Sequence, residues 1–303
     1  MFRIFSHPDC AGHATPGEHP ECPARLAAAM RGLKRIIGLD FRQATPIAPE
    51  VLELVHSRQH IDRMQRLDAE DRREAVDPDT WFGPGSMRAA LLAAGATCEG
   101  VDQVMEARCQ RAFAVVRPPG HHAESGRAMG FCIFNNIALA ALHALTEHGL
   151  DRVAICDFDV HHGNGTEEIV SGNRKLLFVS SHQSPLYPGT GAAESPAAEN
   201  ICNATLPPGA TSDAFRGIWL SELLPRVVAF RPQLVMVSAG FDGHNADPLA
   251  QLRLKDEDFF WIGQELRKVA DQHAGGRLVA SLEGGYDLDA LERSVQAFAE
   301  ALV

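Results

Sequence analysis

Two aspartates and two adjacent histidines follow a short apolar run in the segment CDFDVHHGNG, residues 156–165. The preceding residues, RVAI at 152–155, predict a buried strand. Because alternate residues of a strand share a face, Asp157, Asp159 and His161 can project to the same side. Such a group near a buried sheet needs a cation or a dense hydrogen-bond network to offset desolvation and repulsion. A metal ion is the simplest explanation, and a solvated charge cluster at an exposed strand end is the alternative.

Three other apolar runs also lead into polar residues through turns that contain glycine or proline. They continue as RPPGHH at 117–122, SAGFDGHNADP at 238–248 and SLEGGYD at 281–287. In open parallel sheets, active sites form beyond the carboxyl ends of the strands. A histidine pair or a GGY turn alone indicates little, but four such strand ends together predict one shared site.

The residue types at these strand ends suit a catalytic metal site. Asp159, His161 and Asp247 would supply three ligands and leave an open position for water, as catalytic zinc requires. Water bound to such an ion becomes a nucleophile near neutral pH, and the ion also polarises a carbonyl oxygen. His121 and His122 are placed to handle protons.

Three further polar residues can support this chemistry. Asp157 can orient one histidine through its ring N–H, and Asn164 can orient another without adding charge. Tyr286 can donate a hydrogen bond to the oxyanion that develops during hydrolysis.

Length and composition restrict the class of protein. With 303 residues, 45% of them hydrophobic, the chain can form one large α/β domain. A formal charge of −11 argues against a nucleic-acid-binding surface. The chain lacks an apolar run of membrane-spanning length, about 18 residues, and MFRIFSHPDC predicts a first strand rather than a secretory segment. We therefore expect a cytoplasmic protein without membrane contact, whose seven cysteines are reduced packing residues.

Strand-like and helix-like segments alternate along the chain. Strands are expected at Phe2–Phe5, Ala112–Val116, Val153–Ile155, Leu176–Val179, Leu234–Val237 and Leu278–Ala280. Helices are expected at Pro23–Ile37, Ser86–Met105, Asn136–His148, Asp213–Phe230, Asp256–His273 and Asp287–Leu302. This alternation predicts a parallel sheet with helices on both faces. Asp68–Thr80 and Gln183–Asn200 are expected to be loops, and the length of the second suggests a binding role.

The motifs together resemble those of the zinc-dependent histone deacetylase superfamily, in particular the bacterial histone deacetylase-like amidohydrolases and acetylpolyamine amidohydrolases. They are RPPGHHA, GFCIFNN, CDFDVHHGNGTEE, SSHQSPLYPGTG, AGFDGHNADPL and LEGGYDL, with SHPDCAGHATPGEHPECPARL at the start. The asparagine of HGNG is closer to the class II and bacterial branches than to class I. The resemblance covers nearly the whole chain.

This resemblance implies a fold, a cofactor and a reaction. The fold is a single arginase/deacetylase-like α/β domain over residues 1–303, with an eight-stranded parallel sheet. One zinc ion would be bound by Asp159, His161 and Asp247. The reaction would be hydrolysis of the amide of an N-acetylated amine, with His122 of the histidine pair as the general base and Tyr286 polarising the carbonyl.

The resemblance also implies the surroundings of the zinc site. Gly130 and Phe131, with Tyr187, would form the walls of an acyl-lysine tunnel, and Arg25 would line an exit for acetate. A structural potassium ion would be bound by Asp157, the backbone carbonyls of Asp159 and His161, and Ser180 with Ser181.

Two residues depart from the family pattern. Tyr187 stands where phenylalanine is more common, which leaves the preference of the tunnel open. Cys22 replaces an arginine near the start, in a position we interpret as structural.

Two alternative functions share parts of this pattern. A ureohydrolase of the related arginase fold binds two manganese ions and carries a further aspartate two residues after the histidine of its D-x-H unit, where this chain has Gly163. A catalytically silent module that binds an acylated ligand would be expected to lose the tyrosine, a metal ligand or a tandem histidine, and this chain has them all. Iron(II) or cobalt(II) could also serve in a site of two carboxylates and one imidazole.

The sequence leaves the substrate open. An acetylated lysine peptide, an acetylated polyamine or another acyl-amine would fit a narrow tunnel that ends at zinc. A homo-oligomer is a further possibility, and its subunit contacts would narrow the tunnel mouth.

Overall fold

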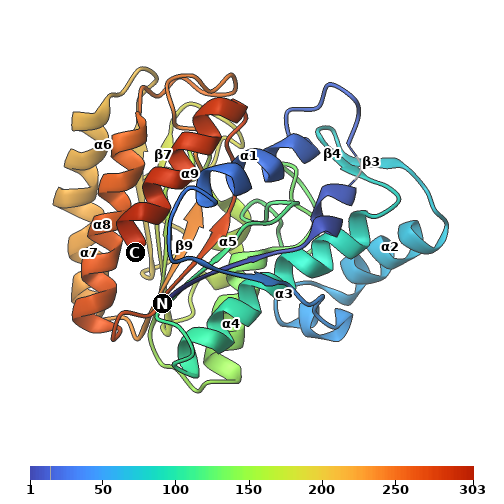
Figure 1. The fold of residues 1–303 in the computed structure, drawn as a ribbon, viewed down its shortest axis with the longest axis horizontal. Coiled ribbons are helices and arrows are strands. Elements are labelled where there is room, and N and C mark those ends of the chain that lie inside the picture. Colours follow the sequence, from blue (N-terminus) through green and yellow to red (C-terminus); the bar gives the residue numbers. More distant parts are fainter. Residues whose placement is uncertain (14) are drawn as a thin grey trace.

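Eight parallel strands form one sheet in the computed structural model, which describes residues 1–13 and 15–303 (Figure 1). The order across the sheet is β2-β1-β5-β10-β9-β6-β7-β8. The strands are β1 Phe2–Ser6, β2 Asp40–Gln43, β5 Arg111–Ala114, β6 Val153–Asp157, β7 Leu176–Gln183, β8 Ile201–Leu206, β9 Leu234–Ala239 and β10 Leu278–Leu282. The predicted fold class is confirmed, because every pairing in this sheet is parallel.

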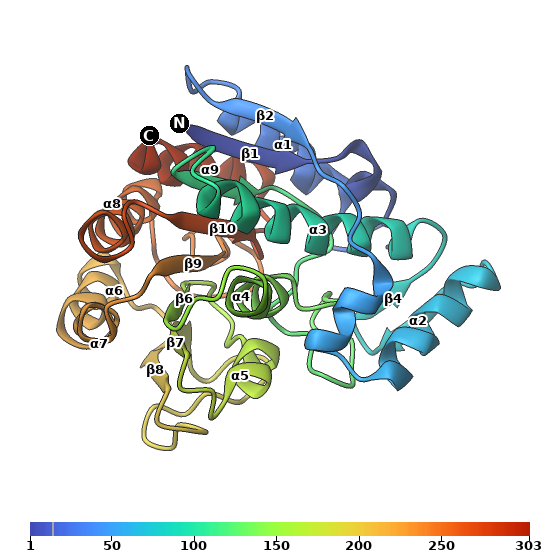
Figure 2. The ribbon, with the colours of Figure 1, turned by 90° about the horizontal axis from the view of Figure 1, so that it is seen from below.

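Helices cover both faces of the sheet, as Figure 2 shows. They are α1 Pro23–Leu33, α2 Arg58–Ala69, α3 Ser86–Met105, α4 Asn136–Thr146, α5 Asn164–Val170, α6 Ser212–Ile218, α7 Leu224–Phe230, α8 Asp256–His273 and α9 Leu288–Leu302. On one side α3 packs against α4, and on the other α9 packs against both α1 and α8. Because helices cover both faces, central strands such as β6 (VAICD) and β10 (LVASL) are buried along their whole length.

The segments predicted to be strands all form strands, but both edge strands were missed. The edge strand β2 reads DFRQ and is mostly exposed, so it lacks the apolar run that marks a buried strand. The other edge strand, β8, reads ICNATL and mixes polar with apolar residues. The loop prediction for Asp68–Thr80 was wrong in part, because β3 (Glu74–Asp77) lies there and forms an antiparallel hairpin with β4 (Thr80–Phe82).

The helix predicted at Asp213–Phe230 is interrupted by a π-helical turn at Trp219–Leu223, between α6 and α7. The physical reason is Pro225, which has no backbone N–H to continue the regular hydrogen-bond pattern. The turn directs the indole of Trp219 inward, where its Nε1 donates to Ser181 Oγ at 2.9 Å.

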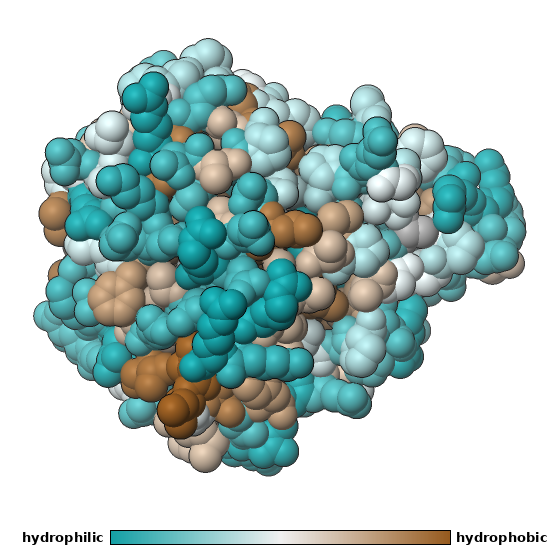
Figure 3. All heavy atoms as spheres, turned by 45° about the horizontal axis from the view of Figure 1, so that its top comes forward, coloured by the Kyte–Doolittle hydropathy of each residue, from teal (hydrophilic) through white to brown (hydrophobic). Residues whose placement is uncertain are grey.

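The face shown in Figure 3 is mainly hydrophilic, with hydrophobic residues in separate patches. Such patches are ordinary for a protein surface in water. Among the helices of residues 1–13 and 15–303, none is long and apolar enough to cross a membrane.

A buried ion network ties the N-terminal segment to the ends of two central strands. Glu21 Oε2 accepts from Arg117 at 2.6 Å, and Glu21 Oε1 accepts from Arg25 at 3.1 Å. All three side chains are fully buried. Arg117 follows β5, and Arg25 in turn donates to the carbonyl of Gly285 beyond β10 at 2.6 Å. One carboxylate therefore holds together the segments that lead into the polar strand ends.

We expect Glu21→Gln to destabilise the fold by about 3–5 kcal/mol, because it leaves two buried guanidinium groups without their counter-charge. Burial would raise the pKa of Glu21, but the two arginines outweigh burial and lower it from 4.5 to about 2. Its stabilising effect is therefore present above pH 4.5 and is lost as the pH falls towards 2. Urea unfolding at pH 7 and pH 3 tests this, with the exposed Glu18→Gln as control. A change below 1 kcal/mol, or one equal to that of the control, would contradict it.

Candidate metal centre and active site

The four polar strand ends meet because their strands are neighbours in the sheet. The strands β5, β10, β9 and β6 are consecutive in the sheet order, and all run in the same direction. The segments after them therefore leave the sheet at the same edge. The predicted convergence is found in the fold.

A close cluster of acids and an imidazole lies at this edge. The cluster consists of Asp159, His161 and Asp242, each of which places one ligand atom within 4.8 Å of those of the other two. His161 Nδ1 lies 3.2 Å from Asp159 Oδ1 and 3.0 Å from Asp242 Oδ2. The Gly284 N–H donates to Asp159 Oδ2 at 2.8 Å, and the Val160 N–H donates to Asp242 Oδ1 at 2.9 Å. The carboxylates are thus oriented by backbone groups of the adjacent segments.

Two glycines make room for these carboxylates. A Cβ on Gly240 would lie 2.0 Å from Asp159 Oδ2, and a Cβ on Gly284 would lie 2.0 Å from Asp242 Oδ2. Any other residue at either position would displace a carboxylate. The glycines that follow β9 and β10 are therefore required by the cluster.

Asp242 was not among the predicted site residues, whereas Asp247 was. Among the described residues, the close group of ligand atoms consists of Asp159, His161 and Asp242 and does not include Asp247. Asp247 nevertheless lies nearby and is largely buried. Its Oδ2 accepts from the Tyr286 N–H at 2.7 Å, and its Oδ1 accepts from the Leu249 N–H at 3.0 Å. Burial and the neighbouring Asp242 raise its pKa to about 7. The signal for Asp242 was its position as the first acid after β9.

The electrostatics of the cluster suit a cation. Burial alone would lower the pKa of an imidazole, but Asp159 and Asp157 raise that of His121 to about 10. Asp242 and Asp159 raise the pKa of His161 in the same way, also to about 10. Burial, together with Asp159, raises the pKa of Asp242. The pKa of Asp159 is lowered, so this carboxylate is ionised, whereas Asp242 and Asp247 favour protons that a divalent ion would displace. The residues therefore fit a metal.

The two adjacent histidines have different partners. His121 Nδ1 lies 3.0 Å from Asp157 Oδ2, whereas His122 Nδ1 lies 2.8 Å from Asn164 Oδ1. The rings are 4.1 Å apart. Burial and the neighbouring His121 hold the pKa of His122 well below 6.5. The two histidines therefore differ in pKa, with that of His121 raised and that of His122 lowered from the ordinary value.

Glu283 supports the histidine pair and was also missed from the sequence. It is fully buried, and its Oε2 accepts from the N–H groups of Gly120 at 2.7 Å and His121 at 3.1 Å. Burial raises its pKa to about 7. Its position directly after β10 was the available signal.

A cavity of about 240 Å³ opens onto these groups. It is lined by Asp79, His122, Gly130, Phe131, His161, Leu186, Tyr187, Leu249 and Tyr286. The predicted tunnel walls Gly130, Phe131 and Tyr187 all line it, and Tyr286 lies at 5.7 Å from Phe131, ring to ring. Aromatic walls with polar groups at one end favour a ligand that has an apolar chain and a polar terminus.

The turn at Gly130 and Phe131 shapes the cavity. Both residues have positive φ, +56° and +67°, and a Cβ on Gly130 would lie 2.4 Å from the ring of His122. The backbone therefore approaches His122 closely and presents Phe131 to the cavity. Of the other lining residues, Asp79 lies in the segment that we predicted to be a loop.

Arg25 lies behind Tyr286 and does not line the described cavity. Its guanidinium carbon is 4.8 Å from the centre of the Tyr286 ring, and the side chain is fully buried. It fixes the position of this ring and of the Gly285 carbonyl.

The serines predicted to bind potassium point in different directions. Ser180 is paired with Asp157 in the register of β6 and β7, and its Oγ lies 2.9 Å from His182 Nδ1. Ser181 faces the opposite side of the strand, where its hydroxyl accepts from Trp219. Of the two hydroxyl groups, only that of Ser180 lies on the side of Asp157.

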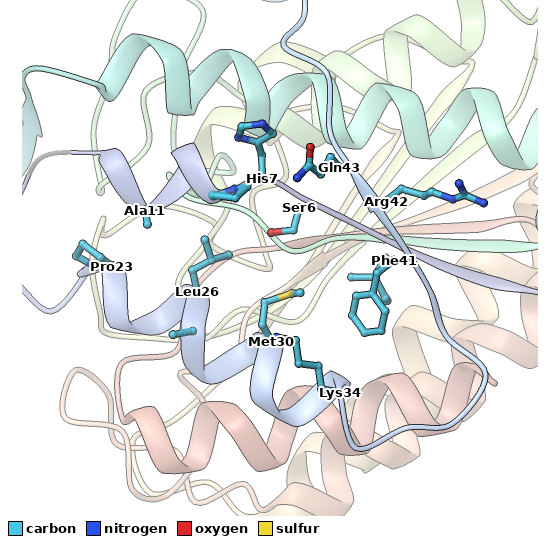
Figure 4. Close-up of a pocket in the computed structure, with 13 residues that line it drawn as sticks. Ser6, His7, Ala11, Pro23, Leu26, Met30, Lys34, Phe41, Arg42 and Gln43 are labelled. Atoms are coloured by element: carbon cyan, nitrogen blue, oxygen red, sulfur yellow. The ribbon is translucent and has the colours of Figure 1, made fainter.

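A larger cavity, of about 450 Å³, lies between α1, β1 and β2 (Figure 4). Leu26, Met30 and Phe41 form apolar parts of its wall, and Lys34 and Arg42 add positive charge. Among the described residues that line it there is one histidine and no carboxylate. It lacks the groups that hydrolysis or metal binding would need.

The sheet order and the cluster at its carboxyl edge define a protein of the arginase/deacetylase fold class. The chain belongs to the histone deacetylase family, because residues 19–302 match the histone deacetylase domain. The crystal structure of the HDA15 HD domain superposes with a TM-score of 0.91 and 34% identity, over 99% of this chain and 88% of that one. The family resemblance of the motifs is thereby confirmed.

Curated relatives bear related names. The chain is 38% identical to the histone deacetylase-like amidohydrolase of Pseudomonas aeruginosa, over 92% of this chain and 74% of that protein. It is 36% identical to a probable deacetylase of Archaeoglobus fulgidus, over 94% of this chain and 81% of that protein. It is 38% identical to the polyamine deacetylase HDAC10 of Mus musculus, over 93% of this chain but 45% of that protein.

We expect wild-type protein to retain one divalent ion after dialysis and Asp247→Asn to lose it, because a carboxamide is a weaker ligand than a carboxylate. Metal analysis after dialysis tests this, with the exposed Asp213→Asn as the matched control. If Asp247→Asn keeps full occupancy while Asp242→Asn loses the metal, the third ligand is Asp242 and the prediction is wrong.

Proposed function

We propose that this protein hydrolyses the amide bond of an N-acetylated amine and releases acetate. The observation that carries the proposal is the combination of an acid–imidazole cluster, an unequal histidine pair and Tyr286 around one aromatic cavity. Each group has a role in amide hydrolysis. The larger cavity between α1, β1 and β2 has one histidine and no carboxylate among the described residues that line it.

The catalytic ion is zinc, bound by Asp159, His161 and Asp247. When bound, zinc supplies a Lewis acid for the carbonyl oxygen and lowers the pKa of its water. The excess of buried carboxylates supports a divalent ion at this position. A structural potassium ion is proposed beside it, bound by Asp157, the carbonyls of Asp159 and His161, and Ser180, with Ser181 contributing through its backbone.

His122 is the general base. It lines the cavity, and its lowered pKa keeps it neutral at pH 7, as a proton acceptor must be. His121 remains cationic beside Asp157 and contributes positive charge to the site. Asn164 fixes the ring of His122 without adding the negative charge that would raise its pKa.

Tyr286 stabilises the oxyanion. Burial raises its pKa well above 10, so the phenol keeps its proton at neutral pH and can donate it in a hydrogen bond. The backbone N–H of Tyr286 is held by Asp247, and its ring is flanked by Arg25 and Phe131. A donor fixed in this way is prepared for the charge that develops on the acetamide oxygen.

The substrate is a linear amine with a terminal acetyl group. A cavity of about 240 Å³ with aromatic walls suits an alkyl chain followed by an acetamide. Acetylated lysine in a peptide and acetylated polyamines both have this form. The names of the amidohydrolase and polyamine deacetylase relatives support the same substrate class.

A ureohydrolase with two metal ions fits less well. The position of its additional aspartate is Gly163, where a Cβ would lie 2.4 Å from Asp157 Oδ2 and 3.1 Å from His121 Nδ1. The site has no room for a side chain at that position. The arrangement of Asp157 and His121 is therefore incompatible with a second ligand from residue 163.

We expect wild-type protein to release acetate from an acetyl-lysine peptide or from an N-acetylated polyamine, and to lose this activity when a chelator is added. Tyr286→Phe should lower kcat by about 10² to 10³ fold with little change in KM, because one oxyanion donor is lost. Tyr187→Phe removes the other phenol hydroxyl of the cavity and is the matched comparison, with any effect expected mainly in KM. No acetate release from either substrate, or a Tyr286→Phe loss below about threefold, would contradict the mechanism.

The partner of His122 should set the acidic limb of the pH–rate profile. Asn164→Asp places a carboxylate beside Nδ1 and raises the pKa of His122, so the neutral form appears only at higher pH. We expect the acidic limb of kcat/KM to move upward by about one pH unit or more. Asn173→Asp, at a position outside the site, is the control. An unchanged limb would remove His122 from the role of base.

A further inference from the structure

A second group of metal-type side chains lies outside the proposed active site. Asp102 on α3, His143 on α4 and His148 in the turn after α4 each place one ligand atom within 4.8 Å of the others. Asp102 Oδ1 lies 2.7 Å from His143 Nε2 and 2.8 Å from His148 Nε2. Both imidazoles therefore direct the same ring nitrogen at one carboxylate oxygen.

This group lies at the opposite end of the sheet from the active site. In a parallel sheet the connecting helices run against the strands, so their carboxyl ends lie at the amino ends of the strands. Asp102 lies near the end of α3, which leads into β5, and the residues after α4 lead into β6. In Figure 1 the strands point away from the lower end of α4. No residue is shared between the two groups.

The arrangement has the composition of a transition-metal site. Two imidazoles and one carboxylate are ligands that zinc, nickel and copper accept, and three protein ligands leave a position for water. The rings of His143 and His148 are nearly perpendicular, 5.8 Å apart at an angle of 77°. Hydrogen bonds to Asp102 hold both imidazoles in place, so little rearrangement is needed for an ion to replace the bonded protons.

The surroundings admit a cation. The side chains of His143, His148 and Asp102 are 15%, 19% and 38% exposed, so the group is oriented by packing and still open to solvent. His143 and Asp102 also line a cavity of about 490 Å³, together with Glu99 and Glu147. Among the described residues that line this cavity there is no lysine or arginine. The local charge is therefore negative.

We propose that Asp102, His143 and His148 form a second metal site, which binds a divalent transition ion such as Zn²⁺ with water completing the coordination. An ion bound there links α3 to the turn that follows α4. Because it binds the folded chain through residues from two helices, it stabilises the fold and leaves the proposed chemistry unchanged. Because its ligands are partly exposed, this site releases its ion more readily than the buried centre.

Calorimetric titration of Zn²⁺ into protein dialysed against metal-free buffer tests this proposal. We expect one further ion to bind per chain, and to raise the thermal midpoint of wild-type protein. In His143→Gln and His148→Gln the affinity should fall at least about tenfold, since each loses one of three ligands. Gln keeps a hydrogen-bond donor for Asp102, so the variants should fold, which circular dichroism checks. His273→Gln is the control for loss of a histidine elsewhere.

The same titration with Asp247→Asn protein separates this site from the active site. In this variant the further ion should bind to Asp102, His143 and His148 with the wild-type affinity, even though acetate release is lost. Likewise, His143→Gln should keep the wild-type rate of acetate release while losing the further ion. Absence of a further ion in wild type, or its retention in the double variant His143→Gln with His148→Gln, would overturn the proposal.

Discussion

The site depends on one constraint, which is that several carboxylates are buried together at the carboxyl edge of the sheet. Asp157, Asp159, Asp242 and Glu283 are fully buried, and Asp247 is nearly so. Burying isolated charges costs many kcal/mol, and neighbouring negative charges add to that cost. Backbone N–H groups and neighbouring imidazoles compensate for part of this cost, and a cation bound at the cluster would compensate for more. Burial and the neighbouring carboxylates raise the pKa of Asp242 and of Asp247, so both acids favour a proton or a metal ion at this position.

Much of the surrounding structure follows from this constraint. Glycines 240 and 284 stand where any side chain would collide with a carboxylate. The sheet order brings β5, β10, β9 and β6 together, although β10 is the last strand in the chain and β5 and β6 lie far earlier. The Glu21 network then fastens the segments after β5 and β10 to the N-terminal part of the chain. The two histidines differ in pKa because Asp159 and Asp157 raise that of His121, whereas burial and His121 lower that of His122.

The sequence allowed the fold class to be predicted, and also which polar strand ends meet at one edge of the sheet, since buried strands and their polar ends leave local patterns. The partners of His121 and His122 followed from the alternation along β6 and from the HGNG turn. Other features depend on packing that no local pattern records. Edge strand β2 is polar because, at the edge of the sheet, it is mostly exposed to solvent. Asp79 reaches the cavity because it lies in the turn of the β3–β4 hairpin. Asp242 and Asp247 are five residues apart, and only tertiary structure decides which of them is closer to His161.

The central claim is that a single divalent ion at this edge balances the buried acids and is bound by Asp159, His161 and Asp247. X-ray diffraction from crystals of the purified protein, measured on both sides of the zinc absorption edge, tests it most directly. We expect an anomalous peak in contact with a carboxylate oxygen of Asp159, a ring nitrogen of His161 and a carboxylate oxygen of Asp247, beside the cavity that Tyr286 lines. Crystals of catalytically active protein with no anomalous peak at this position, or with a peak bound by Asp242 in place of Asp247, would contradict it.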